Sequence, residues 1–405
     1  MHRESWGIDR PPRFCDIQPT PEAMQEMKGK KFMAVRGTIG AALLCALAAI
    51  ALQAQTITTF EIAGSGSAGG QGTIVASINT AGTTVGAYID SGGVSHAFIR
   101  AINGTDTVFN VPNAGTAKGQ GTGAVAINTG GVIAGSYQDS GSVSHGFVRA
   151  TDGAVTEFNA PGAGTGKGQG TIPRAINTAG TTAGNYIDAG GVNHGFVRSA
   201  SGKITAFNAK GAGTGIGQGT FVDPLFSSAP KINTAGTIVG YYIDAGGVLH
   251  GYVRAANGTI TEFNAPGAGT LAKEGTIATG INTSGTIVGR YADSGKIARG
   301  FIRATNGTIT EFAAPGASTN HPGNGTYAFS INDAGVVCGA YGDSSFNAHG
   351  FVRAANGAIT GFEAADAGTK GNGEGTYALV INSAGDVAGY VLDSGSVFHG
   401  FIRTP

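Results

Sequence analysis

The chain has 405 residues, of which 72 are glycine, and charged residues make up only 12% of it. So much glycine excludes a mainly helical protein, while a hydrophobic share of 41% excludes a disordered chain. Basic and acidic residues balance at 25 each, so the sequence offers no electrostatic footprint for nucleic acid or for an anionic membrane.

The first 54 residues differ from the rest of the chain. Residues 28–36 carry four positive charges, and residues 37–52 form a largely apolar run before Gln53 and Ala54. A basic segment followed by an apolar run and a small residue is typical of a secretory signal peptide. The apolar run is shorter than a typical transmembrane helix. We therefore expect a signal peptide at 27–54 and a secreted protein, extracellular or periplasmic, without a permanent membrane span. Residues 1–26 are interpreted as a non-native or disordered extension.

From residue 55 onwards, the motif Ile-Asn-x-x-Gly recurs at spacings of 49 to 56 residues. This period predicts one domain at 55–405, built from seven repeat units that we number in chain order. The motifs begin at Ile78, Ile127, Ile176, Ile232, Ile281, Ile331 and Ile381.

Each unit contains four strand-length runs separated by turn signals. The first run leads into Ile-Asn, and the second follows the glycine of the motif and ends at an aspartate. The third begins near a histidine and ends at Asn-Gly, Asp-Gly or Ser-Gly in units one to six, dipeptides that favour a tight hairpin. The fourth ends at a phenylalanine. Four antiparallel strands per unit are therefore predicted.

The two ends of the repeat region complement each other. Residues 56–64 read TITTFEIAG and reproduce the fourth run of unit four, TITEFNAPG, which begins at Thr259. Unit seven ends after its third run and lacks a fourth. We therefore expect residues 56–62 to pair with 399–403 and to close a seven-bladed β-propeller of four-stranded antiparallel blades. An open stack of β-units is the alternative.

Taken together, Ile-Asn-x-x-Gly, Val-x-Gly and His-Gly-Phe or His-Ala-Phe resemble the bacterial extracellular repeats named after the His-Ala-Phe tripeptide (HAF repeats). The tripeptide itself stands at residues 96–98, and the resemblance covers residues 56–405. It implies secretion and assigns neither a reaction nor a ligand.

Three polar residues recur at fixed places in the units. We expect the aspartates to cap turns, with peripheral Ca²⁺ as the alternative, and the histidines to bond to that aspartate or to a carbonyl. The arginines are expected to form ion pairs with the aspartates. The aspartates are Asp90, Asp139, Asp188, Asp244, Asp293, Asp343 and Asp393; the histidines are His96, His145, His194, His250, His349 and His399, with Arg299 in unit five; the arginines are Arg100, Arg149, Arg198, Arg254, Arg303, Arg353 and Arg403.

Departures from the repeat are better candidates for a binding site than the repeated residues. The crossing into unit four carries extra residues that include Phe221, Asp223, Leu225 and Phe226, and the crossing into unit six adds His321. An exposed apolar segment predicts a contact patch, whereas folding back between blades is the equal alternative. These residues are the predicted ligand contacts.

No catalytic motif accompanies the repeats, and Cys338, the one cysteine outside the first 54 residues, is expected to be a small buried side chain. The residues favour a monomeric binding module for a glycan or an extracellular protein, without a cofactor or metal, over an enzyme. A polysaccharide hydrolase or lyase with carboxylates on the propeller axis is one alternative. A structural repeat protein of the cell envelope is the other.

Overall fold

The computed structural model describes residues 55–222 and 231–405, and within them it contains 28 β-strands and no helix. The prediction of an all-β fold is confirmed for this part of the chain. The proposed signal peptide at 27–54 and the extension at 1–26 lie outside the described residues and stay predictions. In the described part, no helix is long and apolar enough to cross a membrane.

Each unit forms antiparallel strands joined by short turns. The first strands are β2 (Gly72–Ile78), β6 (Gly121–Ile127), β10 (Gly170–Ile176), β14 (Gly219–Phe221), β18 (Gly275–Ile281), β22 (Thr326–Ile331) and β26 (Gly375–Ile381). The second strands are β3 (Thr84–Ile89), β7 (Ile133–Gln138), β11 (Thr182–Ile187), β15 (Ile238–Ile243), β19 (Ile287–Ala292), β23 (Val337–Gly342) and β27 (Val387–Leu392).

The outer half of each unit has the same regularity. The third strands are β4 (Ser95–Arg100), β8 (Ser144–Arg149), β12 (Asn193–Arg198), β16 (Leu249–Arg254), β20 (Ala298–Arg303), β24 (Ala348–Arg353) and β28 (Phe398–Thr404). The fourth strands are β5 (Asp106–Phe109), β9 (Val155–Phe158), β13 (Ile204–Phe207), β17 (Ile260–Phe263), β21 (Ile309–Phe312) and β25 (Ile359–Phe362), and β1 (Thr56–Phe60) lies beside β28.

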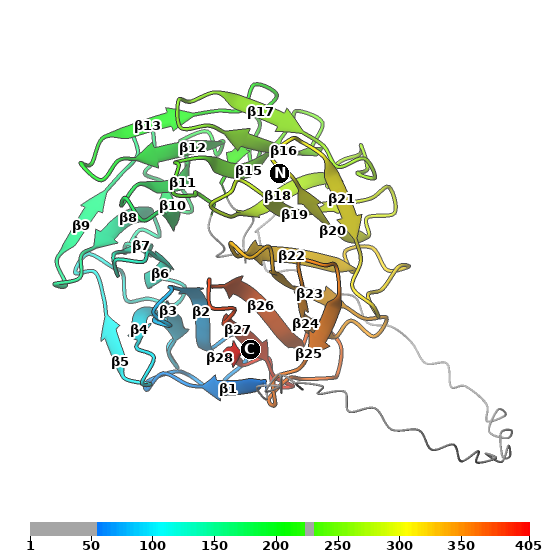
Figure 1. Cartoon of the computed structure of the whole chain (residues 1–405). Coiled ribbons are helices and arrows are strands. Elements are labelled where there is room, and N and C mark those ends of the chain that lie inside the picture. The colour runs from blue at the N-terminus through cyan, green and yellow to red at the C-terminus, as the bar shows by residue number, and fades with distance from the viewer. Residues whose placement is uncertain (1–54, 223–230) are drawn as a thin grey trace, which may run out of the picture. The chain divides into compact units, whose positions relative to one another are not determined.

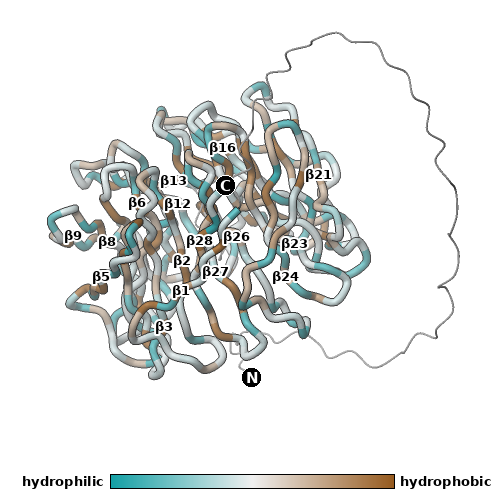
Figure 2. The backbone as a smooth tube through the Cα atoms, turned by 60° about the horizontal axis from the view of Figure 1, so that its bottom comes forward, coloured by the Kyte–Doolittle hydropathy of each residue, from teal (hydrophilic) through white to brown (hydrophobic). Residues whose placement is uncertain are grey.

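Within residues 55–405, the units follow one another around an axis, with the first strands innermost and the fourth strands at the periphery (Figure 1). This radial repetition of small antiparallel sheets defines a β-propeller. Apolar residues concentrate on the strands and polar residues in the loops (Figure 2), as expected when each sheet packs its faces against its neighbours.

Aromatic pairs connect neighbouring units at the outer edge of the core. The phenylalanine that ends each fourth strand meets an aromatic ring of the following third strand edge to face, at centroid distances of 5.9–6.4 Å. Phe98 and Phe147 are examples of the fully buried partner. Such pairs add roughly 0.5–1.5 kcal/mol each beyond the burial of their area.

A second set of contacts lies near the axis, at the asparagine of each Ile-Asn motif. Each side-chain amide nitrogen donates to the asparagine carbonyl of the next unit at 3.1–3.5 Å, and Asn382 donates to Asn79, which connects the last unit to the first. The amide oxygen accepts the N–H four residues later, as in Asn79 to Thr83. The buried amide thus holds its own turn and reaches the neighbour.

At the ends of the described chain, β1 runs antiparallel to β28, from Thr56 opposite Thr404 to Phe60 opposite Gly400. Just after β1, the N–H of Ile62 donates to the hydroxyl of Thr73 at 3.0 Å. The chain therefore places its N-terminal strand at the position that a fourth strand holds in the other units.

Cys338 lies in β23 and is fully buried, and its thiol donates to the carbonyl of Ala378 at 3.4 Å. Burial raises the pKa of this thiol far above its usual value. Its place in the core agrees with the small buried side chain expected from the repeat.

Substituting Phe60 tests how much β1 contributes to stability. Phe60 meets Phe98 at 6.4 Å and lies under the guanidinium of Arg100 at 4.2 Å, so we expect Phe60→Ala to lower the free energy of unfolding by about 2–3 kcal/mol. Thr58→Ala, at an exposed position of the same strand, should cost less than about 1 kcal/mol. Urea denaturation measures both, and equal small losses would contradict a stabilising role for β1.

Candidate functional site

The repeated histidines form a regular contact within their own units. Nε2 of each of the six donates to Oδ2 of the aspartate at 3.1–3.3 Å. The aspartate Oδ1 accepts a backbone N–H four residues later at 2.9–3.0 Å in all seven units. Both oxygens of every aspartate are therefore engaged: Oδ1 holds the turn in all seven units, and Oδ2 holds the histidine in six of them, as the sequence favoured. Arg299 takes the histidine's place against Asp293 at 3.1 Å.

Turn geometry also sets the ionisation of these aspartates. In unit one, the hydrogen bond from the Val94 N–H lowers the pKa of Asp90, and His96 adds to this against the opposing effect of partial burial. In the described part of the chain, no group of three or more His, Cys, Asp or Glu side chains could hold a metal ion. Calcium at these turns stays an untested alternative.

The predicted ion pair between the repeated arginine and the turn aspartate is wrong. The arginine stands four residues beyond the histidine, about 13 Å along an extended strand, so it reaches the opposite end of the blade. Each of the seven guanidinium groups instead lies over the phenylalanine of the preceding fourth strand, 4.2–5.1 Å from the ring centroid. Arg100 also pairs with Asp106 at 2.8 Å. These arginines therefore hold adjacent units together by cation–π contacts.

The segment singled out in unit four is only partly described. Phe221 is half-buried in β14, and its ring stacks on Tyr241 at 4.8 Å with an interplanar angle of 7°. Val222 is fully buried in the core. Asp223, Leu225 and Phe226 lie outside the described residues, so the predicted contact patch stays a prediction.

The cavity on the axis is small and offers little chemistry. Its volume is 170 Å³, and the Ile-Asn pairs of all seven units line it together with the residue that follows each pair. Asp333 is the one carboxylate among these lining residues, all of which are described.

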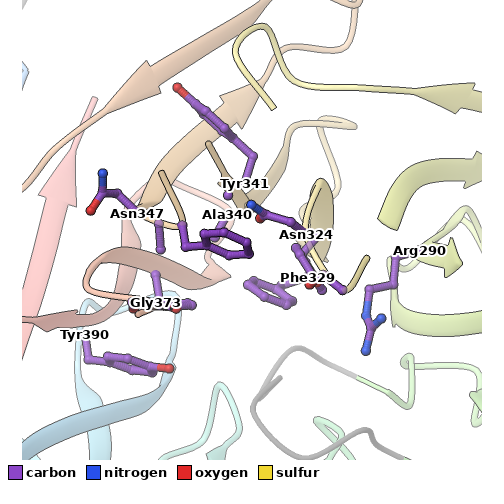
Figure 3. A pocket seen from close by; sticks show the side chains of 14 residues that line it. Arg290, Asn324, Phe329, Ala340, Tyr341, Asn347, Gly373 and Tyr390 are labelled. Atoms are coloured by element: carbon purple, nitrogen blue, oxygen red, sulfur yellow. Dashed lines mark hydrogen bonds between the residues drawn. The ribbon is translucent and has the colours of Figure 1, made fainter. Parts of the chain in front are cut away.

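A larger cavity of 370 Å³ lies between units six and seven (Figure 3). Backbone and side chains of β22, β23, β26 and β27 line it, with the turn that follows β23 and the crossings that precede β22 and β26. Six aromatic residues contribute to its wall: Tyr327, Phe329, Tyr341, Phe346, Tyr377 and Tyr390. We call this cavity the aromatic pocket; Arg290, Asn324 and Asn347 supply its polar side chains.

Cross-strand pairing explains why aromatic rings gather there. One pair of opposed residues on the first and second strands varies from unit to unit: it is Ile74 with Ala87 in unit one, but Tyr377 with Tyr390 in unit seven. Those two tyrosine rings stack at 4.9 Å. In unit six, Tyr327 stands opposite Ala340, and the small side chain leaves space in front of the ring. The aromatic pocket therefore occupies the variable position of the repeat.

Most polar groups of the aromatic pocket already have partners. The hydroxyls of Tyr327 and Tyr377 donate to the carbonyls of Gly323 and Gly373, which secures the two crossings. Asn347 donates to Asp343 at 3.2 Å and accepts from the Gly371 N–H at 2.8 Å. Asn324 likewise donates to the Asp343 carbonyl. These contacts fix the wall before any ligand binds.

Phe346 has an unusual backbone conformation for a bulky residue. Its φ is +64°, in the left-handed region, where the corresponding turn residue is glycine in units one, three and four. A non-glycine residue there costs roughly 1–3 kcal/mol. Its ring lies 4.9 Å from that of His321, the half-buried histidine predicted as a ligand contact. The structure therefore brings His321 to the edge of the aromatic pocket.

Sequence reasoning did not find the aromatic pocket itself. The signal lay in the repeat alignment, where Tyr327 and Tyr377 stand at a position held by isoleucine or glycine in units one, two, three and five and by Phe221 in unit four. It also lay in two unit spacings of 50 rather than 49 residues. The extra residues fall in the two crossings that border the pocket. Comparison of units at that strand position marks units four, six and seven, and the 50-residue spacing separates units six and seven from unit four.

Units six and seven also differ at their histidines. Nδ1 of the histidine faces an asparagine in units one to four, as His96 faces Asn110 at 3.1 Å. His349 faces Glu363 instead, and His399 faces Glu61, the residue after β1. Partial burial lowers the pKa of His399, but the hydrogen bond to Asp393 and the charge of Glu61 outweigh it and raise the pKa above 6.5.

No protein-family model and no curated protein matches this sequence. Solved structures with a similar arrangement include the BP39L lectin from Burkholderia pseudomallei, at 8% identity and a TM-score of 0.49, covering 80% of this chain and 94% of that one. The β-propeller domain of the Trilobed protease from Pyrococcus furiosus matches at 11% identity and a TM-score of 0.46, covering 81% and 94%. TolB from Acinetobacter baumannii matches at 13% identity and a TM-score of 0.42. The match covers 68% of this chain and 62% of the TolB chain, so this chain spans less than two thirds of TolB. These scores assign no ligand or activity.

The contact between His399 and Glu61 is expected to contribute to stability in a pH-dependent way, because His399 must be protonated to be attracted by the charge of Glu61. Because the folded pKa of His399 lies above its usual 6.5, this contribution is fully present below about pH 6.5 and is lost as the pH rises through the folded pKa. Glu61→Gln should reduce the free energy of unfolding at pH 5.5 by less than about 1 kcal/mol, since both groups are partly exposed. At pH 9 it should have almost no effect.

Urea denaturation at the two pH values measures this difference. Glu157→Gln is the control, because Glu157 accepts from Tyr137 and Asn113 and touches no histidine. A loss from Glu61→Gln that is the same at both pH values would show that the Glu61–His399 contact does not depend on protonation.

Proposed function

We propose that residues 55–405 form a seven-bladed propeller closed by β1, and that this propeller is a saccharide-binding module whose site is the aromatic pocket. Two observations support the closed ring: the register of β1 on β28, and the asparagine hydrogen bonds that run from unit to unit and return from Asn382 to Asn79. The HAF-like repeat and the signal-like segment at 27–54 support secretion as part of the same proposal.

The observation that carries the proposed site is the break in the repeat at units six and seven. Residues that recur in every unit are explained by contacts that every blade needs, and the repeated His, Asp and Arg residues all make such contacts. The aromatic pocket instead combines non-repeated aromatic residues with the ring of Phe346, placed at a turn position where all seven units have a positive φ. A large aromatic residue is costly at such a position, and the other units hold glycine, serine or lysine there, so the turn itself does not require the ring.

The composition of the aromatic pocket favours a sugar ring as its occupant. One face of a pyranose carries polarised C–H groups, which pack against the negative face of an aromatic ring, while its edge carries hydroxyls. The aromatic pocket offers several such faces, and its volume of 370 Å³ lies at the lower end of the range for ligand sites. A protein partner would need a flat area of about 800 Å², which a concave pocket does not supply.

The alternative of a hydrolase or lyase on the axis has less support. A glycoside hydrolase of the usual kind needs two carboxylates about 5–10 Å apart. Among the described residues that line the axial cavity, Asp333 is the one carboxylate. A purely structural role in the envelope leaves the aromatic residues of units six and seven without a reason.

Replacing Phe346 with glycine separates binding from folding. Phe346→Gly restores the residue of units one, three and four and relieves the positive φ, so the free protein should keep its stability within about 1 kcal/mol. Loss of the ring should weaken sugar binding at least about tenfold. Thermal unfolding with a panel of neutral and acidic oligosaccharides measures both, because a ligand that binds the folded state raises Tm.

Ser396→Gly is the matched control for this experiment. Ser396 holds the same turn position in unit seven, with a φ of +60°, and it does not line the aromatic pocket. It should leave every ligand-induced shift unchanged. Shifts that survive Phe346→Gly would place the site elsewhere, and the absence of any shift in the unsubstituted protein would overturn the saccharide proposal.

A further inference from the structure

Building on the proposed saccharide site, we infer that the aromatic pocket selects sugars that carry a carboxylate, and that Arg290 binds this carboxylate. The inference deepens the proposed function, since it names the class of sugar rather than another site. It rests on the position of Arg290, the state of its guanidinium and the charges around it.

Arg290 reaches the aromatic pocket from β19, in unit five, on the side opposite Tyr390 (Figure 3). Its guanidinium lies over the ring of Tyr327 at 4.9 Å. A cation–π contact with the ring face uses none of the five N–H donors, so a carboxylate can still accept two parallel hydrogen bonds from the guanidinium. The aromatic contact thus orients Arg290 and leaves its donors available.

The guanidinium of Arg290 has neither a hydrogen-bond acceptor nor an ion-pair partner among the residues that the structure describes. Among the described residues, Arg303 of the same unit also has only a cation–π contact, over Phe263, but it lines neither of the two cavities that Arg290 lines. Arg299 of this unit differs, because its Nε contacts Asp293 at 3.1 Å. Arg100 differs too, because it pairs with Asp106 at 2.8 Å. A half-buried cation without a counter-charge favours an anionic ligand.

The charged residues that line this end of the site, Arg290 and Lys273, are both cations. Arg290 also lines a second cavity of 220 Å³, which it shares with Lys273 of the crossing into unit five. Among the described residues that line the aromatic pocket and this second cavity, none is aspartate or glutamate. A carboxylate entering this end therefore meets two cations in the wall. The nearby carboxylates of Asp343 and Glu274 line neither cavity, and each accepts a backbone N–H of its own turn or crossing.

A second donor stands at the other end. The hydroxyl of Tyr390 has no hydrogen-bond partner within the described part of the chain, and its ring is held by stacking on Tyr377 at 4.9 Å. A sugar laid across the rings can therefore place its carboxylate at Arg290 and a hydroxyl at Tyr390. The two ends of the aromatic pocket thus fix both the charge and the orientation of the ligand.

The fold does not require arginine at this position. The corresponding residues of the other units are Ala87, Ser136, Asn185, Tyr241, Ala340 and Tyr390. Both small polar and large aromatic side chains are accepted there. Arg290→Gln is therefore expected to fold, and any change in binding can be assigned to the loss of the guanidinium.

The experiment compares sugars that differ only at one carbon. D-glucuronate is paired with D-glucose, and D-galacturonate with D-galactose, and oligomers of each acid are included because single rings bind weakly. Affinity is measured by isothermal titration calorimetry on the full chain and its variants. We expect the acidic member of at least one pair to bind about tenfold or more tightly than its neutral partner, with the preference falling as salt is raised.

Arg290→Gln should abolish this preference and leave the weaker binding of the neutral sugar in place. Arg299→His is the matched control: it removes an arginine from the same unit, restores the residue of the six other units and does not line the aromatic pocket. It should retain the full preference. Equal affinities for acidic and neutral sugars, unchanged by Arg290→Gln, would overturn the inference.

Failure of the inference can be told apart from failure of the proposed function. Binding of neutral sugars that Phe346→Gly weakens, without any preference for the acids, supports the saccharide site and rejects the role of Arg290. Binding of a non-sugar acid such as 4-hydroxybenzoate, with no sugar bound at all, rejects the saccharide site and with it the inference about acidic sugars.

Discussion

The buried amide of the asparagine in each Ile-Asn motif is the contact on which the arrangement of units depends. Its oxygen holds the turn of its own unit, and its nitrogen reaches the carbonyl of the next unit's asparagine. A four-stranded sheet cannot bury both faces by itself, so every unit must be held against two neighbours. Near the axis the amides do this, and at the outer edge the Arg–Phe and Phe–Phe contacts do it.

Because these contacts hold the units together, one position of the repeat can vary without weakening them. The histidines and aspartates hold the turns of their own units, and the repeated arginines lie over phenylalanine rings between units. The opposed pair on the first and second strands has no such fixed role, and it ranges from Gly123 with Ser136 to Tyr377 with Tyr390. A binding site can therefore be built at one pair of units without disturbing the frame that all units share. Units six and seven carry Tyr327, Tyr377 and Tyr390 at this pair of positions, and unit five contributes Arg290.

The repeat made the strands and their order predictable, because period, turn dipeptides and hydrophobic alternation all point to the same four-stranded unit. The hydrogen bond between each histidine and the turn aspartate was also one of the two contacts expected from the sequence. The predicted Arg–Asp pair was wrong because it rested on complementary charge and did not consider that the arginine lies four residues beyond the histidine, at the opposite end of the strand from the aspartate. The aromatic pocket was missed because its residues come from three units and two crossings, and only spatial packing brings Tyr327, Phe346 and Tyr390 together.

The position of the aromatic pocket has a further consequence for how binding and folding are linked. One of its walls is unit seven, whose fourth strand in the proposed ring is β1, from the opposite end of the chain. Tyr377 and Tyr390 lie on β26 and β27, and β27 pairs with β28, which β1 covers. Displacing β1 would expose β28 and loosen the wall that carries both tyrosines. A ligand held between units six and seven must then stabilise the closed ring, because a ligand that favours one state shifts the equilibrium toward it by its differential affinity.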